Sequence, residues 1–226
     1  MKTKARRPDQ EEKDVLDQLG DFITDFVKSK KIFDGGKDKA RKDDDEDLSY
    51  IKAMLDDKSV AALMPSSKFM VKRIIKAMDL RGAKTVIEYG AAAGVITREI
   101  LPRLPADGRL LAVEFNRPLF DMLSRIADPR LILAHGDVRE IDAIAAKHGI
   151  EQADVVVSGV PFSMFSGRQR HELLLKTHAL VRPGGRFVAY QVTTHLITML
   201  DDYFKRFETE FEIRNLPPHF IFTAYK

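Results

Sequence analysis

Small and acidic residues that could hold a nucleoside-containing ligand follow several apolar stretches of the chain. Gly90 and Gly94 enclose three alanines directly after the stretch at residues 84–89. Such a turn lets a ligand approach the backbone closely, although a tight connection with a purely structural role is the alternative. Glu114 lies 20 residues after Gly94 (114 − 94 = 20), and Asp137 follows another apolar stretch. An acidic side chain at that spacing can accept hydrogen bonds from both hydroxyls of a ribose.

Alternating strands and helices are needed to bring these groups together. Strands are predicted at residues 84–89, 108–115, 130–136, 153–160 and 185–192, and helices at 95–104, 118–126, 138–147, 168–180 and 196–207. The first strands are continuous apolar runs, as expected for parallel strands covered by helices on both faces. Ligands of such sheets bind beyond the carboxyl ends of the strands, where the small and acidic residues lie.

The end of the chain predicts two further strands. Residues 211–226 contain no helix-forming run, and Pro217 and Pro218 separate two extended segments. A strand pair joined by a short turn is antiparallel. The predicted fold class is therefore α/β, with a doubly wound, mostly parallel sheet of seven strands.

Residues 1–47 are predicted to form an extension, and residues 48–226 the main domain. Apolar residues recur at three- and four-residue steps within residues 11–33, which is typical of an amphipathic helix, and a charged block follows up to Asp47. The helix could lie on an anionic membrane surface or pack on the main domain. Residues 48–80 read as two helices interrupted at Pro65, with Ser66 or Ser67 as a cap.

Composition excludes several classes of protein. The chain has 226 residues and no cysteine, so disulfides and thiolate metal sites are absent, and no metal is expected. A formal net charge of +3 favours neither nucleic acid nor membrane binding. No stretch approaches the roughly 20 apolar residues of a membrane span, and the basic N-terminus lacks the apolar segment of a secretory signal. We expect a cytoplasmic protein.

This order of motifs resembles the class I S-adenosylmethionine-dependent methyltransferases, with their Rossmann-like sheet, over residues 69–226. The stretch "VRPGGRF" at residues 181–187 is similar to the family's turn into its fifth strand. The resemblance implies S-adenosylmethionine as cofactor. It assigns cofactor binding to Ser67, Glu88, Gly90, Ala91, Gly94, Glu114, Phe115, Asp137, Val138 and Ser158.

Within this set the resemblance implies separate roles. Glu88 and the two glycines would hold the methionine end, and Glu114 the ribose. Phe115 would lie against the adenine, whose edge Asp137 and Val138 would read; Asp137 could equally be a helix cap. A dinucleotide enzyme shares half of this pattern, but its turn seats a pyrophosphate and favours a third glycine.

The segment after the fourth strand, "SGVPFSMF", bears on the methyl acceptor. Methyltransferases that act on planar bases often carry an Asn or Asp, two prolines and an aromatic residue there. In this chain Ser158 replaces the amide and Pro161 is the one proline. This argues against methylation of adenine or cytosine.

Three stretches, "SGVPFSMFSGRQRHELL", "YIKAMLDDKSVAALMPSSKFM" and "RNLPPHFIF", resemble the bacterial phospholipid N-methyltransferases. That family converts phosphatidylethanolamine stepwise to phosphatidylcholine and is itself similar to the ribosomal RNA adenine dimethyltransferases. The resemblance covers residues 50–226. It implies that Ser67 covers the cofactor. Substrate-binding residues would be Gly159, Val160, Pro161, Phe162, Phe165 and Arg168.

A phosphatidylethanolamine head group is an ammonium beside a phosphate at an interface. Phe162, Met164 and Phe165 could form an apolar lip for the lipid, or could be core residues. Arg168 and Arg170 could meet the phosphate, or could belong to a solvated helix face.

The ammonium must lose a proton before its nitrogen can attack. Tyr190 and His195, near the end of the fifth strand, are candidate bases or hydrogen-bond acceptors, although such residues are often structural. Backbone carbonyls around Gly159 and Val160 are an alternative amine site.

The leading hypothesis is a cytoplasmic enzyme that methylates phosphatidylethanolamine at the inner face of the membrane. Its partners would be the lipid amine and, through the N-terminal helix, an anionic membrane surface, without nucleic acid. The alternatives are an RNA adenine N6-dimethyltransferase and a non-catalytic membrane-surface protein on the same fold.

Overall fold

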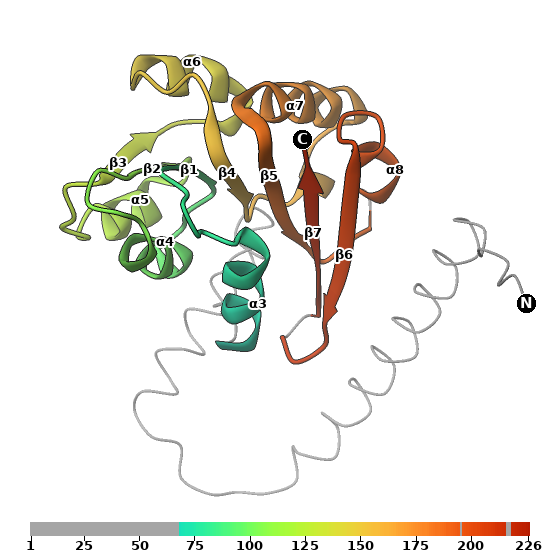
Figure 1. Cartoon of the computed structure of the whole chain (residues 1–226), viewed down its shortest axis with the longest axis horizontal. Helices are drawn as coiled ribbons and strands as arrows, with labels where there is room; N and C mark the ends of the chain where they lie inside the picture. The colour runs from blue at the N-terminus through green and yellow to red at the C-terminus, as the bar shows by residue number, and fades with distance from the viewer. Residues whose placement is uncertain (1–67, 195, 216–217) are drawn as a thin grey trace, which may run out of the picture. The chain divides into compact units, whose positions relative to one another are not determined.

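The computed structural model describes residues 68–194, 196–215 and 218–226, and within them the strands form one sheet of order β3-β2-β1-β4-β5-β7-β6 (Figure 1). The strands are β1 (Thr85–Tyr89), β2 (Arg109–Glu114), β3 (Leu131–His135), β4 (Ala153–Ser158), β5 (Val181–Gln191), β6 (Arg206–Glu212) and β7 (His219–Tyr225). Strands β1 to β5 pair in parallel, whereas β7 is antiparallel to both β5 and β6. The predicted α/β class, the seven-stranded sheet and the antiparallel end are confirmed.

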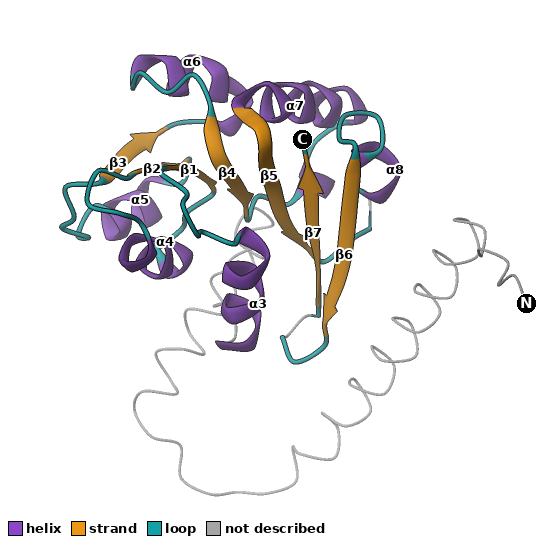
Figure 2. Cartoon of the chain, viewed as in Figure 1, coloured by secondary structure: helices purple, strands orange, loops and turns teal. Residues whose placement is uncertain are grey.

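Helices cover both faces of this sheet (Figure 2). They are α3 (Lys68–Met78), α4 (Val95–Ile100), α5 (Arg117–Leu123), α6 (Ile141–Lys147), α7 (Gly167–Leu180) and α8 (Ile197–Leu200), with single 3₁₀ turns η1 (Leu101–Arg103), η2 (Val138–Glu140) and η3 (Phe162–Met164). The elements α3 and α4 pack with Val86, Val155 and Val188 on one face. On the other face, the Tyr89 hydroxyl meets Thr177 of α7.

Alternation of strand and helix follows from the sequence pattern. Strands β1, β2 and β4 are buried almost throughout, because each is a continuous apolar run with helices on both sides. Helix α7 begins with a capping box, in which the Ser166 hydroxyl accepts from Gln169 N–H and the Gln169 side chain accepts from Ser166 N–H.

The predicted helix at residues 196–207 is wrong over most of its length. Helix α8 ends at Leu200, and the chain enters β6 at Arg206. Phe204 lies in the core, where it stacks on Phe187 at 6.0 Å. The spacing of apolar residues in 196–207 resembles that of a helix. Residues 206–212 nevertheless form a strand, because each of them pairs with a residue of β7.

Several predictions concern residues outside those described. They include the helix at residues 11–33, the domain boundary at Asp47, the cap at Ser67 and the role of His195. No helix among the residues described has the length and apolar character needed to cross a bilayer.

Candidate active site

Parallel pairing brings four strand ends to one edge of the sheet. Tyr89 of β1 pairs with Val113 and with Ser158, and Glu114 pairs with His135. The loops that follow β1, β2, β3 and β4 therefore adjoin one another. This is the edge at which an open α/β sheet binds its ligands.

The turn after β1 requires small residues for two steric reasons. Gly90 and Gly94 have φ values of +67° and +85°, in the left-handed region that favours glycine. A Cβ on Gly90 would lie 2.8 Å from Val160 Cγ2, and one on Gly94 would lie 2.5 Å from Ile126 Cδ1. The turn therefore packs directly against Val160 of the loop after β4 and against Ile126 after α5, and the approach of a ligand to its backbone stays a prediction.

Glu114 is held by two backbone amides at the end of β2. Its Oε2 accepts from Ala92 N–H at 2.9 Å, and its Oε1 accepts from Asn116 N–H at 2.7 Å. The side chain is buried. Each carboxylate oxygen keeps a lone pair for a further donor, so both hydroxyls of a ribose can bind this fixed group.

Glu88 lies buried inside β1, below the same turn. Its Oε2 accepts a 2.6 Å hydrogen bond from Thr97 Oγ1 of α4. Burial, with a smaller contribution from the Glu114 carboxyl, raises the pKa of Glu88 to about 8. A cation bound beside Glu88 would favour its ionised form. Glu88 is therefore suited to the positively charged methionine end of S-adenosylmethionine.

The residues predicted to surround the adenine lie after β2 and β3. Phe115 is 71% exposed, and its carbonyl oxygen is 3.0 Å from His135 Nε2. Asp137 caps η2 by accepting from Arg139 N–H at 2.8 Å. The Arg139 side chain also binds this carboxylate and lowers the pKa of Asp137. Asp137 is thus a cap, and its adenine contact, like that of the buried Val138, stays a prediction.

The segment after β4 is fastened to the end of β5 by a residue that sequence reasoning missed. Gln191 Oε1 accepts from Phe162 N–H at 2.8 Å, and its Nε2 donates to the Val160 carbonyl at 2.9 Å. Gln191 is 3% exposed. Its sequence signal was a lone amide closing the apolar run "FVAYQ". Gln191 therefore determines the path of the predicted acceptor loop.

Tyr190 lies against the same loop, and its contact with an acceptor stays a prediction. A Cβ on Gly159 would lie 2.2 Å from the Tyr190 hydroxyl, so only glycine leaves room for this ring. Burial raises the pKa of Tyr190, and the carboxyls of Glu88 and Glu114 raise it further. At neutral pH the phenol keeps its proton, which favours a role as hydrogen-bond partner over a role as base.

The residues of the predicted apolar lip differ in how far their side chains are buried. Phe162 is fully buried and packs edge-on against Phe165 at 6.1 Å, so it supports the loop from within. Met164, by contrast, is 53% exposed, and Phe165 and Pro161 are partly exposed. Ser158 is buried, and its Oγ accepts from Val160 N–H at 3.3 Å. Of the two predicted phenylalanines, Phe165 is therefore the one placed to meet a ligand.

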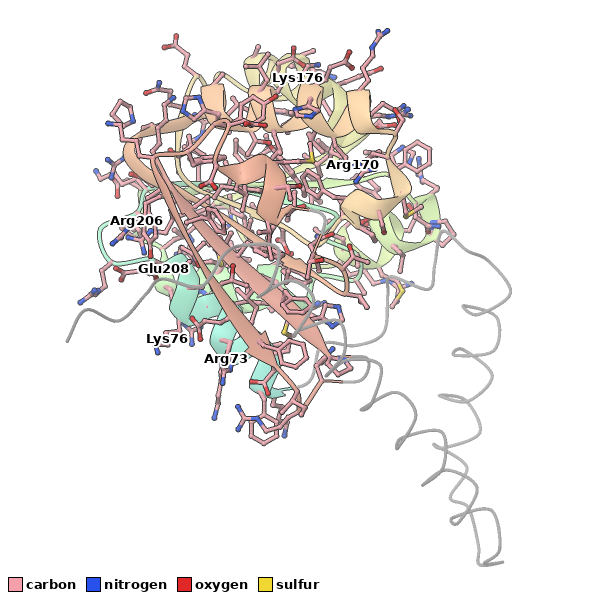
Figure 3. The ribbon with its side chains drawn as sticks, turned by 90° about the vertical axis from the view of Figure 1, so that its right-hand side faces the viewer. Arg73, Lys76, Arg170, Lys176, Arg206 and Glu208 are labelled. Carbon is pink, nitrogen blue, oxygen red and sulfur yellow. The ribbon has the colours of Figure 1, made fainter. Side chains whose placement is uncertain are left out.

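The two candidate phosphate-binding arginines differ in environment. The Arg168 side chain is 88% exposed and pairs with Glu172 at 2.8 Å on its own helix. Arg170 lies on the stripe of α7 that carries the buried Leu173 and Leu174 (Figure 3). Its Nε is buried and has no hydrogen-bond partner in the described part of the chain. The buried Nε of Arg170 therefore still needs a hydrogen-bond acceptor, whereas Arg168 already has one in Glu172.

Among the described residues, no group of three or more His, Asp or Glu side chains is arranged to hold a metal ion. The geometry instead provides a small-residue turn, two buried carboxyls and a fastened loop at one edge. The residues present fit S-adenosylmethionine: Glu114 is held by two backbone amides in an orientation suited to a ribose, and the buried Glu88 lies below the same turn.

Comparison with characterised proteins agrees with this geometry. The chain is 32% identical over 168 residues to an ornithine lipid N-methyltransferase from Singulisphaera acidiphila, covering 71% of this chain and 85% of that protein. It is 30% identical over 118 residues to ribosomal RNA small subunit methyltransferase A from Xanthomonas euvesicatoria, but spans only 43% of that relative. No family model matches the chain.

Solved structures share the fold at lower sequence identity. The O-methyltransferase TomG from Streptomyces achromogenes, in complex with S-adenosylmethionine, superposes with a TM-score of 0.58 at 18% identity, covering 71% of this chain and 81% of that one. Precorrin-6y C5,15-methyltransferase from Geobacter metallireducens gives 0.55 at 17% identity, covering 70% and 89%. The fold is therefore that of methyltransferases, and S-adenosylmethionine is the cofactor.

Proposed function

Because this chain belongs to the class I S-adenosylmethionine-dependent methyltransferases, in the family of ornithine lipid N-methyltransferase, we propose that it methylates the amine of a membrane lipid. The specific substrate proposed is phosphatidylethanolamine, converted stepwise towards phosphatidylcholine. The enzyme would work in the cytoplasm, on the inner face of the membrane. The predicted helix at residues 11–33 would assist its attachment.

The presence of Ser158 at the end of β4 is the observation that most directly supports an aliphatic amine as the methyl acceptor. Ser158 occupies the position where a base-modifying enzyme commonly has an amide or carboxylate, and its Oγ already accepts from Val160 N–H. No side-chain amide is therefore presented there to grip the edge of a base. The loop instead offers backbone carbonyls and the Tyr190 hydroxyl, which suit the several N–H donors of an ammonium.

Methyl transfer requires alignment more than acid-base chemistry. S-adenosylmethionine supplies a methyl group already activated on a sulfonium. The chain must hold the acceptor nitrogen in line with that methyl group and exclude water. Gln191 contributes by fixing the carbonyl of Val160 and the amide of Phe162.

The ammonium would lose its proton to bulk water on entering the site, and its surroundings would assist that loss. Partial burial of the amine beside the loop favours the neutral form. The Tyr190 hydroxyl can accept one hydrogen bond from the amine while its own proton stays in place, because its pKa is raised. We propose Tyr190 as the acceptor that orients the nitrogen lone pair.

The lipid phosphate needs a cationic partner within reach of the amine site. Arg170 lies on α7, one turn before the buried Leu173 and Leu174 and close in sequence to the acceptor loop. Its Nε has no hydrogen-bond partner among the described residues, whereas Arg168 is engaged by Glu172. We propose that Arg170 binds the phosphate in a charge-assisted, planar arrangement.

A methyl-transfer assay tests the proposed function. The full-length protein and methyl-labelled S-adenosylmethionine are incubated separately with phosphatidylethanolamine vesicles, ornithine lipid vesicles and unmodified ribosomal RNA. Label in phosphatidylethanolamine is the expected result. Label only in ornithine lipid would retain lipid N-methylation and overturn the proposed head group. Label only in RNA would overturn the lipid substrate, and label in none would overturn the enzymatic function on these acceptors.

A further inference from the structure

Exposed apolar side chains gather at the ligand edge of the sheet. Nine large apolar residues are exposed in the described part of the chain, and seven of them lie in the last two residues of a strand, follow a strand end, or begin α3 or α4 at that edge. The seven are Phe69, Val95, Phe115, Met164, Val192, Phe211 and Ile213. Isolated exposed apolar residues are ordinary, but concentration along one edge indicates a contact surface.

Two of these residues belong to a corner built from the start of α3 and the turn after β6. Phe69 is 47% exposed and Ile213 is 53% exposed. The Arg214 guanidinium lies 4.1 Å from the centre of the Phe69 ring, which joins the turn to the helix. We call Phe69, Ile213, Lys68, Lys72 and Arg214 the hairpin corner.

An ion cluster around the buried Glu212 holds the hairpin corner in shape. Glu212 is 1% exposed and accepts hydrogen bonds from Arg214 Nε at 2.7 Å and Nη2 at 2.8 Å. It also pairs with Arg73 of α3 at 2.5 Å, and Arg73 reaches Glu210 at 2.8 Å. The Arg214 hydrogen bond is the main reason that the pKa of Glu212 is lowered to about 2. The apolar side chains are thus displayed on a fixed support.

Charge at the corner is positive. Lys68, Lys72, Arg73 and Arg214 are opposed by Glu210 and Glu212, which leaves 4 − 2 = +2. Lys68 and Lys72 are exposed one turn apart on α3. Apolar residues that enter the acyl boundary beside lysines that meet anionic head groups are typical of proteins that rest on a membrane surface.

We propose that the hairpin corner binds an anionic bilayer and sets the acceptor edge of the sheet against it. The inference rests on the proposed function, because a lipid substrate gives the edge a reason to meet a bilayer. Gln191 at the end of β5 pairs with Phe220 at the start of β7, so the corner and the acceptor loop occupy the same edge. This contact would be made by the catalytic domain itself, in addition to any contact by residues 11–33.

Site-specific fluorescence tests the corner without requiring turnover. Because the chain contains no cysteine, single-cysteine variants can be labelled at one position each. We expect Ile213→Cys, carrying an environment-sensitive fluorophore, to shift to shorter wavelength with vesicles of phosphatidylglycerol and phosphatidylcholine. The matched control is Leu175→Cys, since Leu175 is 59% exposed but lies two turns into α7. No shift is expected there.

Neutralising the two lysines gives a second, independent measurement. Lys68→Gln with Lys72→Gln should weaken vesicle binding by about fivefold per lysine, on the order of 20-fold together. Lys147→Gln, an exposed lysine at the end of α6, should leave binding unchanged. Each variant retains Arg73 and Glu212, so the ion cluster remains.

The outcomes separate this inference from the proposed function. If the protein sediments with vesicles but position 213 shows no shift and the lysine variant binds like the Lys147 control, the corner proposal is overturned. If the corner responds as expected but no lipid is methylated, the proposed function fails and the membrane surface stands.

Discussion

Replacing Glu88 with Gln should stabilise the ligand-free protein at neutral pH and weaken cofactor binding. Glu88 is 2% exposed and is bonded to Thr97. Because burial raises its pKa from 4.5 to about 8, the native carboxyl holds a proton at neutral pH that the unfolded chain has lost. The native state then binds more protons than the unfolded state, so native stability falls as pH rises from 4.5 to 8.

The size of this effect follows from the pKa shift. At pH 7 the carboxyl lies 7 − 4.5 = 2.5 pH units above its unfolded pKa. At about 1.36 kcal/mol per unit, the destabilisation approaches about 3 kcal/mol. A Gln at position 88 has no proton to lose and can accept the Thr97 hydrogen bond with its carbonyl. Glu88→Gln should therefore raise the melting temperature at pH 7 by roughly 6–12 °C.

Thermal unfolding of Glu88→Gln and the parent chain at several pH values measures this effect. We expect the two melting temperatures to be close at pH 4.5 and to separate as pH rises to 8. Glu151→Gln, at an exposed glutamate before β4, is the matched control and should show no pH-dependent difference. Equal melting temperatures at pH 7, or a less stable Glu88→Gln protein there, would refute the reasoning.

Cofactor binding supplies the second half of the same prediction. The sulfonium and ammonium of S-adenosylmethionine favour an ionised carboxylate, so binding to the parent chain near pH 7 should release a proton from Glu88. Calorimetry in buffers of different ionisation enthalpy counts that proton. Glu88→Gln should bind more weakly and release fewer protons. Proton release unchanged by the substitution would remove Glu88 from the cofactor site.

Three other substitutions test the rest of the site. Glu114→Ala should weaken S-adenosylmethionine binding by about tenfold or more in a calorimetric titration, because two amide-oriented ribose contacts are lost; unchanged affinity would contradict the placement of the ribose. Gln191→Leu should lower kcat at least tenfold while cofactor affinity stays near that of the parent chain, since the Phe162 amide and Val160 carbonyl lose their partner; an unaltered kcat would show that the loop does not depend on it. Arg170→Gln should raise KM for phosphatidylethanolamine about tenfold, whereas Arg168→Gln, which removes only an exposed pair, should not; equal effects of the two would exclude a phosphate role for Arg170.

The sequence alone determined the features that depend on neighbours along the chain. Continuous apolar runs identified β1, β2 and β4, because a strand buried on both faces needs no alternation. The run at β3 was apolar too, although this edge strand is mostly only partly buried. The small-residue turn was also readable, since a left-handed backbone at Gly90 and Gly94 restricts the residue type locally. The acidic residue 20 positions after Gly94 followed from the fixed length of one helix and one strand.

Only the tertiary structure decided which side chains meet across long separations. Arg73 and Glu210 are 137 residues apart, and Gln191 reaches Phe162 across 29. The tertiary structure also gave Arg168 and Arg170 different environments. Positions two residues apart on a helix point about 200° apart around its axis, so only Arg170 turns toward the sheet. Residues 206–212 became β6 for the same reason. Helical spacing is a local preference, whereas backbone pairing and burial are set by a partner strand that arrives later in the chain.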